Sequence, residues 1–402
     1  MAADHLVVVG ASLAGLRSVE AARRSGHRGR VTLVGAESHP PYDRPPLSKD
    51  FLNPADPPDV PWHRDDAVLA ELEVDLRLGT RATALDPAAR RIEVGGEWVG
   101  YDALVIATGA APRSLPGADD LAGVHTLRTL DDARAIRAAL DRGARTVVVG
   151  AGFIGSEVAA AARLRGLPVT IVEALPVPMA RAIGAEMGAA ISRLHEVNGT
   201  EVRCGVAVTG LAGDGRVERV LLSDGEELRA DLVVVGIGTV PETDWLRSSG
   251  LDVRDGIACD ATLCAGPPGV YAAGDVARWY SARFGRGLRI EHWTNASEQG
   301  ALAARNALDP AAARPYDGVP YFWSDCYDSK IQFAGIPDAE EIEVVGDPDA
   351  LRFTALYRGG DRLVGALSVN QPGRNAKCQV LIARGAGWRE ALERIGSRAP
   401  TP

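Results

Sequence analysis

The stretch RTVVVGAGFIGSEVAAAARLRGLPVTIVE limits most narrowly how this chain can fold. It joins an apolar run to three glycines, Gly150, Gly152 and Gly155, then to a helix-forming run and a second apolar run that ends at Glu173. This order is typical of a βαβ unit that binds a dinucleotide. Gly150 is expected to form the tight turn, Gly152 to admit the pyrophosphate, and Gly155 to let helix and strand pack closely. The pyrophosphate would then lie at the positive end of the helix dipole.

Glu173 predicts which pyridine nucleotide the site takes. A carboxylate at the tip of the second strand accepts hydrogen bonds from the ribose hydroxyls of NAD and repels the 2′-phosphate of NADP. Arg181 follows downstream and carries the opposite charge. We expect NADH to be preferred over NADPH.

A second unit of this kind opens the chain, HLVVVGASLAGLRSVEAARRSGHRGRVTLVGAE. Gly10 and Gly15 take the first and third glycine positions, and Ser12 takes the second. Serine is small, and its hydroxyl can donate to a phosphate. The acid is Glu37, and the sequence leaves open its position relative to the end of the strand. The alternative is an ordinary βαβ unit without a ligand. Two nucleotide units in one chain suggest FAD and NAD(H).

Composition limits the class of protein. The chain has 402 residues, 46% of them hydrophobic and 24% charged, which is ordinary for a globular enzyme of two or three domains. No apolar run is long enough to span a membrane, and MAADHLVVVG is interpreted as a core strand and not a signal peptide. Five cysteines form no disulfide framework, so a cytoplasmic protein is expected. The net charge of −9 argues against nucleic-acid binding, and the seven histidines show no metal-ligand spacing.

Positive charge gathers near the C-terminus. Residues 351–402 contain nine Lys/Arg and three Asp/Glu, a balance of +6. This segment is either a docking face for an acidic partner or a solvated face without one.

Further motifs resemble a known family. YDALVIATGAAPR (101–113) and GVYAAGDVA (269–277) resemble the ATG and GD signatures of FAD-dependent pyridine nucleotide reductases with the glutathione reductase fold. PPYDRPPLSKDFL (40–52) and RIEHWTNASEQG (289–300) resemble the NADH-dependent ferredoxin reductases of bacterial cytochrome P450 and dioxygenase systems. LRTLDDARAIRAAL and YFWSDCYDSKIQFAG continue the resemblance in the family's order.

The resemblance implies an α/β fold with two Rossmann-like dinucleotide-binding domains and a small C-terminal α/β domain. The expected divisions are 1–110 and 230–308 for the FAD-binding domain, 111–229 for the NAD-binding domain, and 309–402 for a domain that covers the flavin and contributes to docking. It also implies hydride transfer from NADH to FAD and single-electron transfer to a ferredoxin that serves a cytochrome P450 or dioxygenase.

Site residues carry over from the family by position. The FAD contacts would be Gly10, Ser12, Ala14 and Gly15 at the pyrophosphate, Glu37 at the ribose, Ala82 at the adenine, Arg44, Lys49, Thr108, Gly109 and Arg128 along the cofactor, Asp275 at the ribityl chain and Trp293 at the pyrimidine edge. The NADH groove would consist of Gly150, Gly152, Ile154, Gly155, Glu173 and Gly236. Lys49 would stabilise the reduced flavin, and Glu157, beside the nicotinamide, would be its ion-pair partner.

The cysteines test the main rival, a disulfide reductase. Cys259 and Cys264 have the C-x-x-x-x-C spacing of that class, but they lie just before the GD signature and far from the first-domain helix where the redox pair belongs. We therefore expect no disulfide chemistry. Cys326 stands where related reductases have glutamine; it is either a thiol that faces the flavin or a buried residue.

Docking and alternative functions complete the expectations. We expect the basic residues Arg352, Arg358, Arg362, Arg374 and Lys377 to steer an acidic ferredoxin. A rubredoxin or quinone reductase of the same fold stays open. So does an NADH-responsive flavoprotein that acts through protein interactions, which the absence of a long insertion disfavours.

Overall fold

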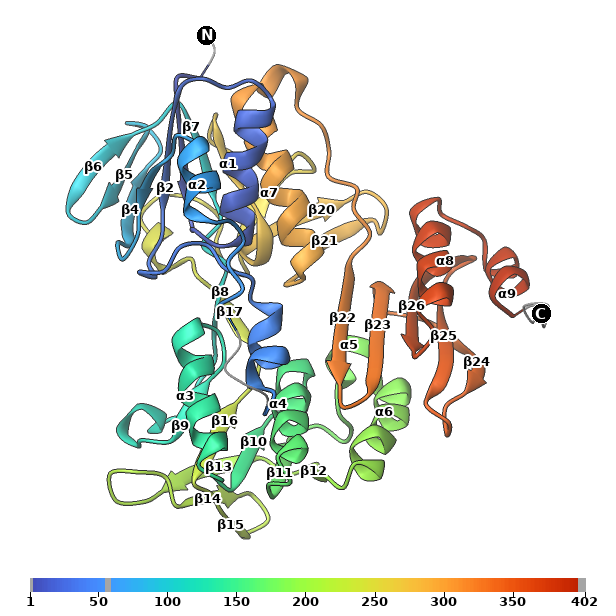
Figure 1. Cartoon of the computed structure of the whole chain (residues 1–402). Helices are drawn as coiled ribbons and strands as arrows, with labels where there is room; N and C mark the ends of the chain where they lie inside the picture. The colour runs from blue at the N-terminus through green and yellow to red at the C-terminus, as the bar shows by residue number, and fades with distance from the viewer. Residues whose placement is uncertain (1–2, 55–58, 397–402) are drawn as a thin grey trace. The chain divides into compact units, whose positions relative to one another are not determined.

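The computed structural model describes residues 3–54 and 59–396. It divides into two compact units (Figure 1). Of the described residues, the first comprises 3–43, 60–111 and 240–320, and the second comprises 44–54, 59, 112–239 and 321–396.

A five-stranded parallel sheet forms the centre of the first unit. Its strands, in spatial order, are β19 (Val270–Ala272), β7 (Ala103–Ile106), β1 (His5–Val9), β2 (Arg30–Val34) and β3 (Asp75–Arg77). The apolar runs of β1 and β7 are buried because both faces of a parallel sheet are covered.

Two helices of the first unit, α1 (Leu13–Arg24) and α7 (Trp293–Leu308), pack side by side (Figure 1). Gly300 permits this contact, since a Cβ atom there would lie 2.2 Å from the carbonyl oxygen of Ala14. The Ser18 hydroxyl, buried between the helices, can donate to the carbonyl of Ala14 at 2.8 Å or to that of Gly300 at 2.9 Å. The α1–α7 pair therefore fixes the start of α1, where the first glycine turn lies.

Smaller elements complete the first unit. They are α2 (Asp66–Glu71), the antiparallel sheet of β4 (Ala82–Asp86), β5 (Arg91–Val94) and β6 (Glu97–Gly100), the sheet of β18 (Ile257–Cys259), β20 (Ala277–Ser281) and β21 (Arg286–Arg289), and the 3₁₀ turns η4 (Asp244–Leu246), η5 (Gly274–Val276) and η6 (Pro310–Ala312). The strands β8 (Ala110–Pro112) and β17 (Thr239–Pro241) contain two of the five points at which the chain passes between the units.

The second unit contains a parallel sheet in which four of the five strands have the same connectivity as in the first sheet. The fifth strand lies at the edge in both, but it precedes the others in the sequence here and follows them in the first unit. Its strands, in spatial order, are β12 (Glu201–Cys204), β11 (Val169–Glu173), β10 (Thr146–Val149), β16 (Leu232–Val235) and β9 (Val124–Thr126). Because β16 pairs with β10, this region extends past residue 229, where the sequence analysis divided the domains. The helices α3 (Leu130–Asp141) and α4 (Phe153–Leu164) share a buried cluster with the sheet.

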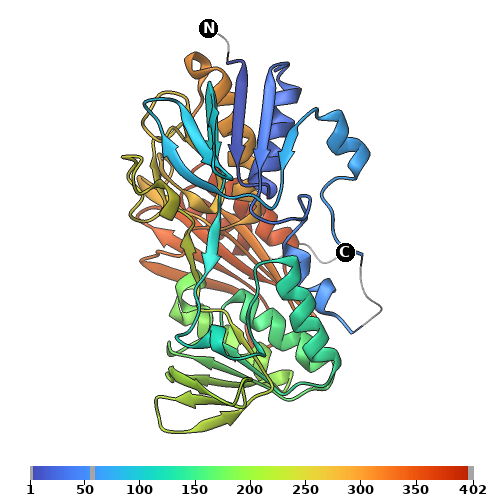
Figure 2. The same ribbon diagram turned by 90° about the vertical axis from the view of Figure 1, so that its left-hand side faces the viewer.

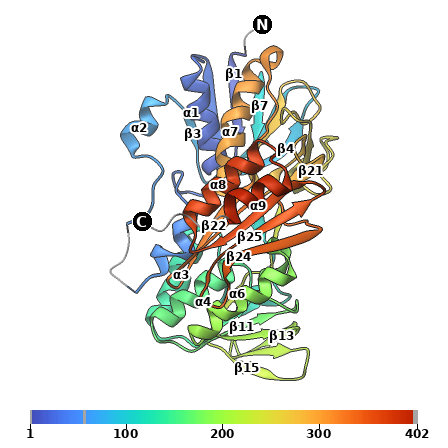
Figure 3. The same cartoon turned by 90° about the vertical axis from the view of Figure 1, so that its right-hand side faces the viewer.

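Residues 321–396 form an antiparallel sheet and two helices within the second unit (Figure 3). The strands, in spatial order, are β22 (Tyr321–Cys326), β23 (Ser329–Gly335), β26 (Arg362–Val369), β25 (Arg352–Gly359) and β24 (Glu341–Asp347), and the helices are α8 (Pro372–Ala383) and α9 (Trp388–Gly396). Phe322, Phe333 and Tyr357 of this sheet share a core with Ile183 and Ile191 of two helices that follow β11. These helices are α5 (Ala180–Ile183) and α6 (Ala185–Val197).

The remaining elements of the second unit are short. They are the antiparallel sheet of β13 (Val208–Ala212), β14 (Arg219–Leu222) and β15 (Glu227–Arg229), drawn in yellow-green in Figure 2, and the 3₁₀ turns η1 (Pro45–Ser48), η2 (Asp50–Leu52) and η3 (Ala118–Asp120). Across the part of the chain that the structure describes, no helix has both the length and the apolar character needed to cross a membrane.

Candidate active site

The second glycine turn joins β10 to α4. Gly150 has φ +101°, a left-handed conformation that favours glycine, and a Cβ atom there would lie 2.4 Å from the carbonyl oxygen of Gly236. A Cβ atom at Gly155 would lie 2.1 Å from the carbonyl oxygen of Gly150. Both glycines are therefore required by contacts within the protein backbone. Gly236, predicted for the NADH groove, is one of those contacts.

Gly152 has a different environment. Its backbone is extended (φ −77°, ψ −175°), and a Cβ atom there would meet no heavy atom within 4 Å. Nothing in the fold excludes a side chain at this position, so the space beside it can admit a ligand. Ile154, two residues later, is 40% exposed although its side chain is apolar. The open backbone at Gly152 is where the sequence predicts a pyrophosphate.

The start of α4 suits an anion. Gly152 is the N-cap residue and offers no side-chain cap, and the first turn has no acidic residue. In contrast, α3 begins with a capping box in which Thr129 and Asp132 satisfy each other's backbone N–H groups. Because α4 leaves its positive end uncompensated by its own side chains, a phosphate is the kind of group that can complete it.

Glu173 is the last residue of β11, and its carboxylate is held by backbone groups. One oxygen accepts from the N–H of Ala151 and the other from the N–H of Leu175, each at 2.8 Å. Each carboxylate oxygen has a further lone pair that can accept from a ribose hydroxyl. Cys204 is its neighbour across the sheet, and burial together with the Glu173 charge raises the pKa of that thiol. Glu173 is thus fixed beside the glycine turn, which is the position that the predicted contact with an adenosine ribose requires.

The first glycine turn has matching geometry. Gly10 has φ +117°, and a Cβ atom there would lie 2.1 Å from the carbonyl oxygen of Ala107. A Cβ atom at Gly15 would lie 1.8 Å from the carbonyl oxygen of Gly10. Ser12 is the N-cap residue of α1 in extended conformation, Ala14 lies in the first turn, and that turn has no acidic residue. The first unit therefore presents a second helix N-terminus that fits a pyrophosphate.

The structure fixes the register of Glu37, which the sequence leaves open. The N–H of Gly10 donates to the carbonyl of Val34, as the N–H of Gly150 donates to that of Val172, each at 2.8 Å. Gly35 therefore takes the place of Glu173, and Glu37 lies two residues farther along the loop. Its carboxylate accepts a hydrogen bond from the Tyr42 hydroxyl.

Other predicted FAD residues of the first unit lie at the carboxyl edge of its sheet or beside it. The Thr108 hydroxyl, after β7, donates to the carbonyl of Glu242 at 2.9 Å. Gly109 has φ +73°, and its carbonyl accepts from the N–H of Glu242 at 3.0 Å. Ala82 begins β4, in the separate antiparallel sheet.

Asp275 and Trp293 lie at η5 and at the first position of α7. The Gln299 side chain, fully buried, accepts from the N–H of Gly274 at 2.9 Å and so links α7 to η5. The indole N–H of Trp293 donates to the carboxylate of Asp43 at 2.7 Å. Neither Gln299 nor Asp43 was predicted as a site residue, although both fall within the quoted family motifs.

Three predicted residues of the FAD site belong to the second unit. They are Arg44, Lys49 and Arg128. The Arg44 guanidinium donates to the carbonyl of Arg128, whose own N–H donates to the carboxylate of Asp132 at 3.0 Å.

Lys49 and Glu157 form a nearly buried ion pair, as the sequence analysis expected. Lys49 Nζ lies 2.8 Å from Glu157 Oε1, and the side chains are 15% and 2% exposed. The hydroxyls of Ser48 and Ser324 also donate to this carboxylate, one to each oxygen. A buried charge is costly unless it is paired and hydrogen-bonded, and these three donors meet that requirement for Glu157. Neither serine was singled out in the sequence.

The cysteines are all free thiols. Cys326 is fully buried, and its thiol donates to the carbonyl of Ser156 at 3.3 Å. Burial, and then the Glu157 charge, raise the pKa of this thiol far above its ordinary value. The interpretation of Cys326 as a buried residue is therefore confirmed. Burial also raises the pKa of Cys259 to about 12, so that thiol is poorly suited to redox exchange. No cluster of three or more His, Cys, Asp or Glu side chains suited to a metal ion occurs within residues 3–54 and 59–396.

The chain matches known protein families over most of its length. A family model described as pyridine nucleotide-disulphide oxidoreductase matches residues 4–300, and one described as reductase C-terminal matches residues 321–392. The chain is 40% identical to the ferredoxin–NAD⁺ reductase component of the anthranilate 1,2-dioxygenase system of Burkholderia cepacia, over 96% of each chain. It is 34% identical to putidaredoxin reductase of Pseudomonas putida, over 92% of this chain and 89% of that protein.

Solved structures of ferredoxin reductases also match this chain. The covalent complex of putidaredoxin reductase with putidaredoxin contains a chain that matches with a TM-score of 0.93 and 32% identity, over 99% of this chain and 97% of the other. The ferredoxin reductase for the CYP199A2 system of Rhodopseudomonas palustris matches with a TM-score of 0.88 and 34% identity, over 98% and 100%. The predicted fold class and the resemblance to ferredoxin reductases are confirmed. The chain belongs to the pyridine nucleotide-disulphide oxidoreductase family and carries that family's reductase C-terminal domain.

Proposed function

We propose that this chain is an FAD-dependent, NADH-oxidising ferredoxin reductase that supplies electrons to a cytochrome P450 or a dioxygenase. One observation carries the proposal: two parallel sheets, alike in the connectivity of four strands, each present a glycine turn and a helix whose first turn has no acidic residue. One turn suits FAD and the other suits NADH. The relatives named above are ferredoxin–NAD⁺ reductases. Because the reaction draws on NADH, we place it in the cytoplasm.

The second turn would bind NADH by its non-reacting end. The N–H groups at the start of α4 receive the pyrophosphate, and Glu173 accepts from the adenosine ribose and rejects a 2′-phosphate. This remote binding energy orients the nicotinamide for transfer. FAD, when bound, accepts the hydride and releases its two electrons one at a time.

Lys49 would supply a positive charge near the flavin. Its ammonium group is held by Glu157, which is held in turn by Ser48 and Ser324. A fixed cation stabilises negative charge that develops in the transition state without reorganising. No protein nucleophile takes part, and the segment 40–52 contains no cysteine at the position of the redox pair in disulfide reductases.

The proposed partner is an acidic ferredoxin. Arg352, Arg362 and Lys377 are exposed on the reductase C-terminal domain, within the segment of charge +6. Arg358 contributes less than the sequence suggested, because its guanidinium lies 2.8 Å from the carboxylate of Glu341. Arg374 donates to the carbonyl of Val345 but keeps its charge. Steering by these charges should weaken as salt increases.

The test is an anaerobic NADH titration of FAD-loaded protein, followed by mixing with a panel of ferredoxins and a cytochrome c readout. We expect bleaching of the flavin by one equivalent of NADH, reoxidation by at least one ferredoxin within seconds, and slower reduction at high ionic strength. Rubredoxin and a soluble quinone serve as competing acceptors in the same assay. Protein that binds no FAD, or a reduced complex that no acceptor reoxidises, would contradict the proposal.

A further inference from the structure

The segment that carries Lys49 is anchored away from its neighbours in the sequence. Residues 44–54 cluster with the second unit, whereas residues 3–43 and 60–111 on either side belong to the first. Lys49 lies between the two short 3₁₀ turns η1 and η2. Turns of three or four residues do not hold a conformation alone, so contacts to the rest of the unit must fix Lys49.

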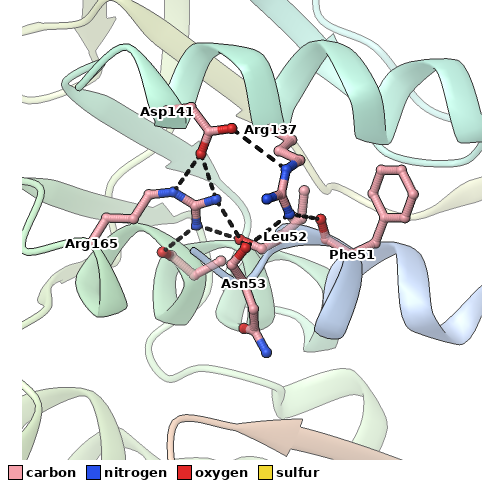
Figure 4. A network of polar contacts seen from close by, with 7 residues as sticks. Phe51, Leu52, Asn53, Arg137, Asp141 and Arg165 are labelled. Atoms are coloured by element: carbon pink, nitrogen blue, oxygen red, sulfur yellow. Dashed lines mark hydrogen bonds and ion pairs between the residues drawn. The ribbon is translucent and has the colours of Figure 1, made fainter. Parts of the chain in front are cut away.

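Two arginines hold the end of η2 by its carbonyl groups (Figure 4). Arg137 Nη1, from α3, donates to the carbonyls of Phe51 at 2.7 Å and Asn53 at 2.9 Å. Arg165, at the end of α4, donates to the carbonyls of Leu52 and Asn53. These are carbonyls that a helix end leaves without intrahelical partners. The two guanidinium groups therefore cap η2 from two helices at once.

Asp141 holds both arginines in place. Its carboxylate lies 2.8 Å from Arg165 Nη2 and 3.5 Å from Arg137 Nε (Figure 4). The arginine side chains are only 11% and 7% exposed for residues 137 and 165, so neutralisation by Asp141 offsets the cost of burying them. Lysine cannot replace arginine here, because a guanidinium presents several donors in a fixed plane and an ammonium group does not.

The segment is also held by an apolar contact and by the ion pair itself. Leu52 is fully buried in the cluster that contains Ile136 and Val158. On the other side of this anchor, Ser48 and Lys49 both reach Glu157. The chain between the carbonyl of Phe51 and the Lys49 ammonium group has little freedom left, because both ends are bound to the same unit.

We propose that Arg137, Asp141 and Arg165 form a guanidinium clamp that positions Lys49 against Glu157 for hydride transfer. The clamp residues are positioning residues and act through Lys49. The inference rests on the proposed function for its kinetic consequence, but the placement of the Lys49 side chain can be measured without turnover.

The placement test uses amine acylation. The chain has three lysines, Lys49, Lys330 and Lys377, and the latter two are exposed. They serve as internal references when an acylating reagent is applied and peptides are mapped by mass spectrometry. We expect Lys49 to react slowly in the unmodified protein and several-fold faster in Arg165→Lys and Arg137→Gln, relative to both references. Equal relative rates in all variants would overturn the proposal.

The kinetic test measures flavin reduction by NADH in stopped flow. Misplacement of a reacting group by about 1 Å can cost about 100-fold, so we expect the clamp variants to lose roughly 10- to 100-fold in the rate constant, with little change in NAD⁺ affinity. Arg134→Gln is the matched control, because Arg134 lies on the same helix and pairs at the surface with Asp131 at 3.0 Å.

A double-variant comparison separates positioning from general stability. If the clamp acts through Lys49, then Arg165→Lys should lower the rate constant in the unmodified protein but not in Lys49→Met. An equal loss in both backgrounds would overturn the proposal. If the arginine variants fold poorly, Asp141→Asn gives the same comparison. The Asp141 side chain is half exposed, so this substitution should destabilise the fold less. Failure of NADH to reduce the unmodified protein would contradict the proposed function alone, since acylation still decides the placement of Lys49.

Discussion

The two glycine turns of this protein differ at one glycine position and in the placement of their acid. In both, the first glycine has a positive φ, and a Cβ atom on it would meet the carbonyl of the residue that follows the neighbouring strand, Ala107 in the first unit and Gly236 in the second. The middle position is Ser12 in one turn and Gly152 in the other, and both are extended. The first and third glycines are therefore required by the fold. The fold does not determine the middle residue, so the ligand that binds there is expected to decide which side chain is tolerated.

The two predicted ribose-binding acids, Glu173 and Glu37, also differ in how their positions are fixed. Glu173 ends its strand and is fixed by the N–H groups of Ala151 and Leu175. Glu37 lies in a loop, two residues beyond the position that corresponds to Glu173, and its carboxylate accepts a hydrogen bond from the Tyr42 hydroxyl. In each unit the parallel sheet fixes the position of the glycine turn. The loop after the second strand determines where the predicted ribose-binding acid lies relative to that turn.

The largest expected effect comes from adding a methyl group at a first glycine. In Gly10→Ala and Gly150→Ala the new Cβ would lie 2.1 Å and 2.4 Å from a carbonyl oxygen, so the turn must open. We expect Gly10→Ala to lose FAD, measured as flavin absorbance per protein. Gly150→Ala should keep FAD but lose about 100-fold or more in the rate of reduction by NADH.

Gly143→Ala is the control for these variants. Gly143 has φ +81°, but a Cβ atom there would meet nothing within 4 Å, so it shares the backbone strain without the clash. The strain alone should cost about 1–2 kcal/mol of stability. If Gly150→Ala also lost FAD while Gly143→Ala did not, the separate roles of the two turns would be wrong.

A smaller effect is expected from reversing the ribose charge. Glu173→Arg should remove the acceptor for the NAD ribose and attract the 2′-phosphate of NADP, which changes the ratio of kcat/KM for the two nucleotides by about 100-fold, or about 3 kcal/mol. Glu37→Arg should leave that ratio unchanged and weaken FAD instead. Steady-state kinetics with both nucleotides measures this, and a ratio that moves with Glu37 but not with Glu173 would reverse the assignment of the turns.

Exchange of the middle residues should give the smallest effect. Gly152→Ser adds atoms only where the fold has open space, so the unfolding midpoint should not fall, but NADH should bind about tenfold more weakly, or by about 1.4 kcal/mol. Ser12→Gly at an N-cap should cost only a few tenths of a kcal/mol in stability. Calorimetry and NAD⁺ titration measure these changes. Loss of the fold in Gly152→Ser would show that the position is structural after all.

Much of this architecture could be predicted because its requirements are local. Gly150 and Gly155 are fixed by backbone contacts within a few residues, and the buried strands on each side are continuous apolar runs. The Lys49–Glu157 pair came from family resemblance, and the structure confirms the contact. Its role in catalysis stays a prediction.

The parts that the sequence did not reveal depend on long-range contacts. Ser48 and Ser324 reach Glu157 across 109 and 167 residues, and a single serine in a loop or strand carries no pattern that marks its partner. Arg137 and Arg165 resemble ordinary helix arginines in the sequence, because the groups that they hold in η2 are backbone carbonyls, which no sequence letter distinguishes. The register of Glu37 depends on where its strand ends, which periodicity does not fix to a single residue.

The interleaved order of the two sheets has a consequence for the nascent chain. The second sheet has all five strands once Val235 has been synthesised, whereas the first sheet waits for β19 at Val270–Ala272. Until then the backbone edge of β7 has no neighbour on one side, and α1 has no α7 against it. On the ribosome, the parallel sheet whose synthesis begins first is therefore the second to be completed, and its exposed edge must be protected from aggregation during that interval.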